Sequence, residues 1–186
     1  MNPLLDIERL LALHDGATTP PAGVAPWADI AANHACNAGL WDEEDLARRR
    51  DVPDAQIVAN KRAIDRFNQE RNDAVERIDV ALLASLPPAN AGARLHSETA
   101  GMMIDRLSIL ALKVRAMRAQ AARADADAAH RSRCRERLGR LEAQRADLAG
   151  CLRDLLADCA AGRACYRIYR QYKMYNDPAL NPHLRR

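Results

Sequence analysis

The fold class is decided by one stretch, LGRLEAQRADLAGCLRDLLADC, which spans residues 138–159. Its apolar residues follow one another at steps of 3, 7, 4, 3 and 4, and they are Leu138, Leu141, Leu148, Leu152, Leu155 and Cys159. Such steps place one apolar stripe along a long helix that packs in a bundle or antiparallel hairpin. The whole chain agrees, because about a fifth of its 186 residues are alanine and only 4% are aromatic. Alanine favours helices and scarce aromatic residues disfavour sheets, so we expect an all-α fold.

Prolines, glycines and polar clusters divide the chain into six expected helices. They cover about residues 2–14, 26–49, 54–86, 99–124, 128–161 and 163–174. Four of these helices are long and joined by short breaks, which favours an up-down bundle with short helices at both ends. We expect one helical domain over residues 1–186, and the half-apolar helix faces are consistent with a homodimer.

Composition and the placement of charged residues and cysteines indicate in which cellular compartment the protein is expected. No uncharged stretch reaches the roughly 20 apolar residues that a membrane span needs. Charged residues precede any hydrophobic run at the N-terminus, which argues against a secretory signal. The five cysteines include no CxxC pair, so they indicate reduced thiols rather than a disulfide frame or a zinc site. We therefore expect a cytoplasmic protein without a membrane span.

The net charge of +3 conceals a difference between the two parts of the chain. Residues 1–112 hold 11 Lys and Arg against 17 Asp and Glu, whereas residues 113–186 hold 17 against 8. A basic part suits an anionic partner such as a phosphorylated ligand, a nucleic acid or a lipid headgroup. The alternative is that the two parts pack together and neutralise each other.

Tyrosines and cations alternate near the C-terminus, where Tyr166, Tyr169, Tyr172 and Tyr175 are interleaved with Arg167, Arg170 and Lys173. Such a pattern can contact phosphates or stack on bases. A period of three, however, drifts by about 60° per step around a helix. The pattern therefore favours a short helix that docks on the bundle, and nucleic-acid binding is the weaker interpretation.

Two expected helices carry unusual polar stripes. In the second helix the stripe is His34, Asn37, Trp41, Glu44, Asp45 and Arg48, and in the third it is Lys61, Asp65, Asn68, Asn72, Glu76 and Asp79. Asp and Asn compete for backbone hydrogen bonds and each lowers helix stability by roughly half a kcal/mol. A ligand site would offset this loss. So would a buried network that ties Asn68 and Asn72 to Arg71, Arg62 or Arg106.

Carboxylates gather in the same helices, and the fourth helix adds Glu98, Asp105, Arg106 and Lys113 near its start. Oxygen ligands of this kind suit Mg²⁺ or Mn²⁺. Glu43-Glu44 and Glu76-x-x-Asp79 resemble part of the pattern of the all-α nucleoside triphosphate pyrophosphohydrolases, but the third acid of its first motif is absent. Mg²⁺ is therefore a candidate cofactor, and the sequence identifies none.

Four segments together resemble one family. The first is Asn37-x-x-Leu40-Trp41 with Glu44-Asp45-x-Ala47-Arg48, and the second is Lys61-Arg62-x-Ile64-Asp65-x-x-Asn68-Gln69-x-Arg71-Asn72-Asp73 through Ile78-Asp79. The third is Glu98-Thr99-x-Gly101 with Ile104-Asp105-Arg106-Leu107-Ser108-Ile109-Leu110-x-Leu112-Lys113. The fourth is Tyr169-Arg170-Gln171-x-Lys173-Met174-Tyr175-Asn176-Asp177-Pro178 with Leu180-Asn181-Pro182. The set resembles the bacterial family catalogued as domain of unknown function 4254, over about residues 30–182. It departs from the family pattern at Asp42, where a histidine often follows the tryptophan, and at Ala100, where a proline often follows the threonine. The resemblance implies a helical fold, a bacterial source and an association with envelope-polysaccharide genes, and it supplies no activity.

We expect the protein to bind a phosphorylated or sugar-nucleotide small molecule between the second, third and fourth helices. As an enzyme it would hydrolyse or transfer that molecule. The carboxylates expected to hold a metal or act as general bases are Glu44, Asp45, Asp65, Glu76 and Asp79. The expected ligand-binding residues are His34, Asn37, Trp41, Asn68, Asn72, Glu98, Asp105, Arg106 and Lys113. The alternative is a non-enzymatic scaffold or regulatory subunit of an envelope-polysaccharide pathway, in which the polar stripes set helix register.

Overall fold

The computed structural model describes residues 4–170, 174 and 177–185. Its helices are α1 (Ile7–His14), α2 (Trp27–Leu46), α3 (Asp54–Ala84), α4 (Ala100–Ala122) and α5 (Ala128–Ala160). Two short strands, β1 (Arg94–Leu95) and β2 (Ala164–Cys165), pair in parallel. The predicted all-α class is confirmed, and no helix in the described chain is long and apolar enough to cross a membrane.

Side-chain caps set where several helices begin. Thr99 caps α4, as predicted, by accepting a hydrogen bond from the Met102 N–H. Asp127 caps α5 in the same way after the break expected there. The first helix begins at Ile7 because Asp6 caps it, so the predicted helix is wrong over residues 4–6. The predicted start at Asn2 lies outside the described residues.

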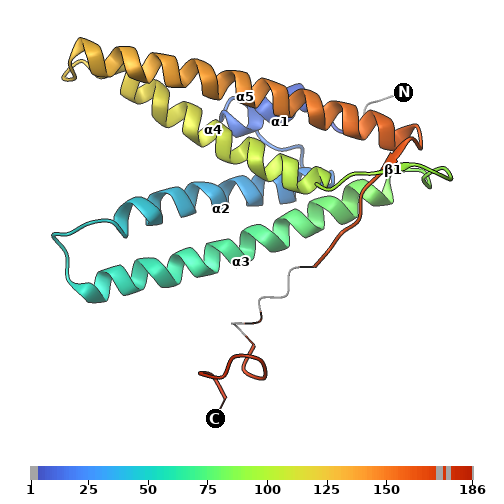
Figure 1. The fold of residues 1–186 in the computed structure, drawn as a ribbon, viewed down its shortest axis with the longest axis horizontal. Coiled ribbons are helices and arrows are strands. Elements are labelled where there is room, and N and C mark those ends of the chain that lie inside the picture. Colours follow the sequence, from blue (N-terminus) through green and yellow to red (C-terminus); the bar gives the residue numbers. More distant parts are fainter. Residues whose placement is uncertain (1–3, 171–173, 175–176, 186) are drawn as a thin grey trace.

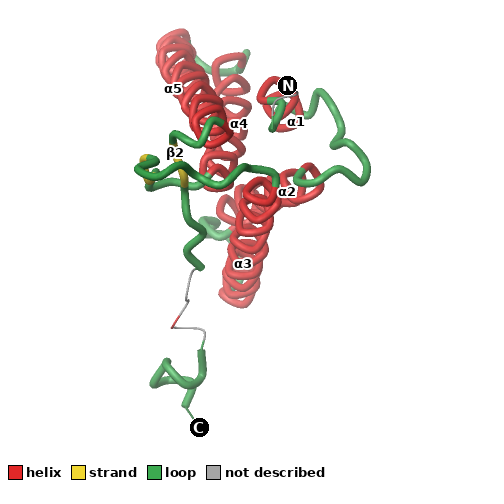
Figure 2. Tube along the Cα trace, turned by 90° about the vertical axis from the view of Figure 1, so that its right-hand side faces the viewer, coloured by secondary structure: helices red, strands yellow, loops and turns green. Residues whose placement is uncertain are grey.

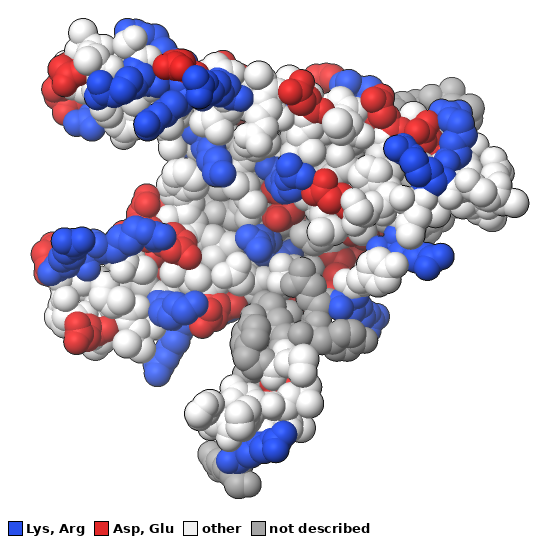
Figure 3. Space-filling model, viewed as in Figure 1, with Lys and Arg blue, Asp and Glu red and all other residues white. Residues whose placement is uncertain are grey.

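The four long helices form two antiparallel hairpins, α2–α3 and α4–α5 (Figure 1). The hairpins meet where α3 ends and α4 begins, and they diverge toward the connections at residues 47–53 and 123–127 (Figure 1). An open notch separates the two hairpins at that end (Figure 3). Seen end-on, α1 lies beside α4 and α2 on one side of the molecule (Figure 2).

The apolar core lies where the hairpins meet. Leu10 of α1, Ile30 of α2, Ile78 of α3, Leu107 of α4 and Leu152 of α5 are all 0% exposed there. One contiguous cluster of buried side chains includes them all.

Two contacts fix helices at this junction. Arg145 of α5 donates from Nη2 to the Leu11 carbonyl at 3.0 Å and pairs with Asp15, so it holds the end of α1. Gly101 allows α4 to approach α3 closely, because a Cβ at this position would lie 2.7 Å from the Val75 carbonyl oxygen.

The predicted sixth helix is wrong over its described residues 163–170. The chain turns at Gly162 (φ +72°), and residues 164–165 then pair with β1. Burial alternates along this segment, with Tyr166 buried and Arg167 and Tyr169 exposed, as in an extended chain. If the segment were a helix, tyrosines at every third position would be spread around it and could not all be buried on one face. An extended segment can instead bury Tyr166 alone. Tyr172, Lys173 and Tyr175 lie outside the described residues.

Candidate functional site

A network of polar side chains is buried between α2 and α4. Asn33 and Asn37 both donate from Nδ2 to Oδ1 of Asp105, at 2.8 and 2.9 Å. The Ser108 Oγ lies 3.0 Å from Asn37 Nδ2 and 2.8 Å from His34 Nδ1. Because Asn37 donates to this hydroxyl, its proton is free to point at the His34 ring. These hydrogen bonds set the register of α2 against α4.

Arg71 of α3 lies at the solvent side of this network. Its Nε is 3.9 Å from Oδ1 of Asp105, which is beyond hydrogen-bond distance. The same Nε is buried and has no hydrogen-bond partner in the described chain. Arg71 thus lies beside a carboxylate without a hydrogen bond from Nε, and the rest of its side chain contributes to the wall of a cavity described below.

Two histidines stack behind the network. The rings of His14 and His34 have centroids 5.0 Å apart. His14 is 4% exposed, and neither ring nitrogen has a hydrogen-bond partner among the described residues. Burial, aided by His34 and Arg145, lowers the pKa of His14 to about 3. Burial, followed by the charge of Arg115, also lowers the pKa of His34. Both rings are therefore neutral near pH 7, and the pair belongs to the packing of α1.

The notch between the hairpins contains a cleft with two compartments. The inner compartment, about 360 Å³, is lined by Asn37, Leu40, Glu44, Arg48, Arg71 and Ile109. The outer compartment, about 590 Å³, is lined by Ala116, Met117, Gln120, Arg137, Arg140 and Leu141. Trp41, Asp45 and Lys113 line both compartments, which therefore adjoin. We call the two together the inter-hairpin cleft.

Positive charge predominates in the inter-hairpin cleft. Its cations are Arg48, Arg71, Lys113, Arg137 and Arg140, and its carboxylates are Glu44 and Asp45. Lys and Arg side chains lie on both walls of the notch (Figure 3). Arg48 is paired with Glu44, whereas Lys113 and Arg137 form no ion pair in the described chain. The cleft can therefore accept an anion without first breaking those two cations away from a protein partner.

A second cavity of about 310 Å³ lies between α3, the start of α4 and the C-terminal segment. Asp79 is 2% exposed at its wall, and its Oδ1 accepts a hydrogen bond from the Gly101 N–H at 2.7 Å. Burial raises the pKa of Asp79, although hydrogen bonds from Thr99 and the Gly101 N–H act in the opposite direction. Asp79 thereby fixes the first turn of α4 on α3.

The structure does not bring the predicted site residues together in one place. Asn37, Trp41, Glu44, Asp45 and Lys113 line the inter-hairpin cleft, with His34 and Asp105 in the network behind it. Asn72, Glu76 and Asp79 line the second cavity instead. The structure thus divides the predicted residues between two cavities, and Arg71 and Asn72, which are consecutive on α3, line different ones.

Besides His34 and Asp105, four predicted residues line neither cavity. Asp65 is exposed and pairs with Lys61 at 2.6 Å, so its predicted catalytic role is not supported by its position. Glu98 and Arg106 pair with each other at 2.6 Å beside the start of α4. Asn68 is half-buried and makes no hydrogen bond in the described chain. The alternative network that would tie Asn68 to Arg71, Arg62 or Arg106 is therefore not found among the described residues, where Arg71 lies beside Asp105 and Arg106 pairs with Glu98.

The carboxylates expected to hold a metal are also dispersed: Glu44 and Asp45 line the inter-hairpin cleft, Glu76 and Asp79 line the second cavity, and Asp65 lines neither. In the part of the chain that the structure describes, no group of three or more His, Cys, Asp or Glu side chains could hold a metal ion.

Sequence reasoning missed several residues of the site. Asn33 precedes Asn37 by one turn and shares its face, so the polar stripe of α2 could have included it. The sequence does not single out Arg137 and Arg140 from the other cations of the basic part of the chain, because no local pattern shows that α5 faces α2 across a notch. His14 gave no signal either, since its contacts come from helices distant in sequence.

The fold and the cleft define an all-α protein made of two diverging helical hairpins. Residues 27–168 match the family described as protein of unknown function (DUF4254), and the chain belongs to this family. No curated protein and no solved structure matches the chain.

Proposed function

We propose that the protein binds a small phosphorylated molecule, such as a sugar nucleotide, in the inter-hairpin cleft. The observation that carries this proposal is the excess of cations there, above all Lys113 and Arg137, which form no ion pair in the described chain. Phosphate groups are the common small-molecule anions that several Lys and Arg side chains recognise together. The two compartments, about 360 and 590 Å³, are of the size of small-molecule sites, roughly 300–1,000 Å³.

The cleft also offers a surface for a ring. Trp41 is half-buried between the compartments, and Met117 and Leu141 add apolar surface in the outer one. A planar base or a sugar ring can stack on an indole while its phosphates contact the cations. The polar network supports this arrangement from behind, because it holds Asn37 at the cleft wall.

Asp45 is the group best placed for a hydrolytic or transfer reaction. It lines both compartments, and its carboxylate makes no ion pair in the described chain, whereas Glu44 is paired with Arg48. A carboxylate beside a bound phosphate can act as a general base toward water or an acceptor hydroxyl. We assign that role to Asp45 and a binding role to the cations.

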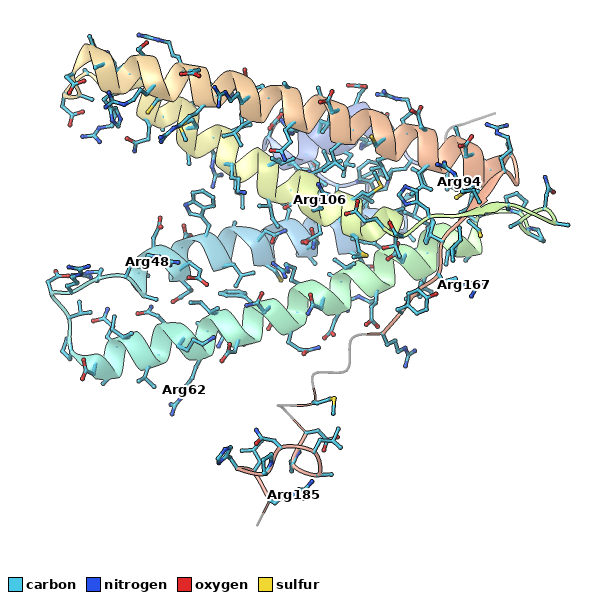
Figure 4. The ribbon with its side chains drawn as sticks, viewed as in Figure 1. Arg48, Arg62, Arg94, Arg106, Arg167 and Arg185 are labelled. Atoms are coloured by element: carbon cyan, nitrogen blue, oxygen red, sulfur yellow. The ribbon has the colours of Figure 1, made fainter. Side chains whose placement is uncertain are left out.

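Calorimetric titration tests the proposal with UDP-glucose, ADP and inorganic phosphate as probes. Lys113→Ala and Arg137→Ala should each weaken binding about ten-fold or more, since a hydrogen bond to a charged group contributes about 1.5–3 kcal/mol. Arg62→Ala is the matched control, because Arg62 is exposed on α3 and points away from the notch (Figure 4). Absence of binding by all three probes, or equal weakening by the control, would refute the proposal.

Turnover is tested separately from binding. Asp45→Asn should bind the probe as the parent protein does and lose any release of phosphate or sugar from it. Unchanged release by Asp45→Asn would remove that residue from the chemistry and leave the binding proposal intact.

The buried network favours a second candidate, a scaffold or regulatory subunit in which polar residues only set helix register. Asn37 and Ser108 are satisfied by each other and by their neighbours, as such a role requires. Under that function, Lys113→Ala would change neither folding nor any association of the protein. Loss of probe binding by this variant therefore separates the two functions.

A further inference from the structure

The C-terminal segment is anchored beside α3 and exposes its next residues. Tyr166 is 4% exposed and packs in the core, while Arg167, Tyr169 and Arg170 lie at the surface. The segment passes α3 close to its C-terminal end, where Arg167 is seen (Figure 4). It closes one side of the second cavity, opposite Glu76 of α3. We call this region the strap surface.

The strap surface carries large apolar side chains that nothing in the described chain covers. Tyr169 is 71% exposed, and Met102, which also lines the cavity, is 42% exposed. Val80, one turn after Glu76 on α3, is 59% exposed. Tyrosine, methionine and arginine are the residues enriched at the centres of protein interfaces. Their clustering around a cavity favours a protein partner here.

Charges on the strap surface are self-complementary. Arg167 and Arg170 stand on one side of the cavity and Glu76 on the other, and none of the three forms an ion pair in the described chain. A two-fold axis places the same patch of two copies face to face, so that a residue of one copy meets a different residue of the other. The arginines of each copy would then meet Glu76 of its partner, twice per dimer.

We infer that the strap surface is the interface of a homodimer, in which Tyr169 of each copy enters the second cavity of the other. An aromatic side chain in a partner's pocket, flanked by charged pairs, is the usual form of an interface hot spot. The second cavity and the inter-hairpin cleft share no lining residue. The proposed interface therefore uses none of the residues that line the cleft, and its test is separate from that of the function proposed for that cleft.

Sedimentation equilibrium of the full chain measures the association. The parent protein should be a dimer at micromolar concentration, and Tyr169→Ala should raise the dissociation constant at least ten-fold. Val58→Ser is the matched control, because Val58 is 48% exposed near the other end of α3. A monomeric parent protein, or a Tyr169→Ala variant that associates as the parent does, would overturn the inference.

Charge reversal tests the pairing itself. The double variant Arg167→Glu/Arg170→Glu and the single variant Glu76→Arg should each dimerise poorly, because like charges then face each other. An equimolar mixture of the two variants restores opposite charges on both sides and should form a heterodimer. If the mixture stays monomeric while each variant is folded by circular dichroism, the strap surface is not the interface. The same conclusion follows if only reversal of Arg137 and Arg140 in the notch abolishes dimerisation.

Discussion

Acidification should destabilise this protein through His14. The pKa of this buried ring is about 3, against 6.5 in the unfolded chain. Because the folded-state pKa is the lower one, the unfolded chain binds the proton first as the pH falls. The contribution of neutral His14 to the free energy of unfolding is therefore fully present above pH 6.5 and is lost as the pH falls toward 3. At pH 5 the unfolded ring is almost fully protonated while the folded ring is neutral. Linkage then gives a loss of about 2 kcal/mol between pH 7.5 and pH 5.

Urea unfolding at pH 7.5 and at pH 5 measures this loss. His14→Phe keeps a flat ring against His34 and removes the titrating group. The free energy of unfolding of this variant should therefore decrease between pH 7.5 and pH 5 by about 2 kcal/mol less than that of the parent protein. His183→Phe is the control, because His183 is exposed near the C-terminus and should leave the parent's pH dependence unchanged. If His14→Phe and the parent protein lose the same stability on acidification, the ring is not buried in its neutral form and the reasoning is wrong.

Further predictions concern helix packing and are measured by chemical unfolding at pH 7.5. Gly101→Ala should destabilise by about 1–3 kcal/mol, because its Cβ would meet the backbone of α3. Gly150→Ala should instead stabilise the protein by about 0.5–1 kcal/mol, because no atom lies within 4 Å of the added Cβ. A lower free energy of unfolding for Gly150→Ala would contradict the packing argument. Asp79→Asn should be neutral or stabilising, since it keeps an acceptor for the Gly101 N–H and removes a buried charge, whereas Asp79→Leu should cost about 1–3 kcal/mol. Asn33→Leu removes a hydrogen-bond donor to Asp105 at a position that is 0% exposed, so it should also destabilise the protein by about 1–3 kcal/mol. An unchanged unfolding midpoint would show that the network does not hold α2 on α4.

The apolar stripe of α5 shows what helical periodicity can and cannot predict. Leu148, Leu152 and Leu155 are buried as predicted, whereas Leu138 and Leu141 of the same stripe are only half-buried. Periodicity identifies the face of a helix that turns toward a neighbour. It does not say how many helices cover that face, and α5 has only α4 beside it where the hairpins diverge (Figure 1).

The same limit explains the mixed outcome for the polar stripes. Asn37 and Asp65 look alike in sequence, since each is a short polar residue at helical spacing from others. Asn37 lies opposite Asp105 of α4 and is buried, whereas Asp65 lies on the exposed surface of α3 beside Lys61. Which stripe is buried depends on contacts between residues about seventy positions apart, and local propensity carries no information on those.

The opening of the notch nevertheless has a cause in the sequence. Where the hairpins meet, α2 and α4 face each other with a polar network whose members satisfy one another, together with leucines and isoleucines. Farther along, the facing positions are Glu44, Arg48, Lys113, Arg137 and Arg140. Closing the hairpins there would remove those charges from water, at several kcal/mol per ion before any pairing. With an excess of cations on the two walls, pairing cannot offset that penalty for all of them. The hairpins therefore pack together as far as apolar and satisfied polar residues extend, and they separate where charged side chains begin.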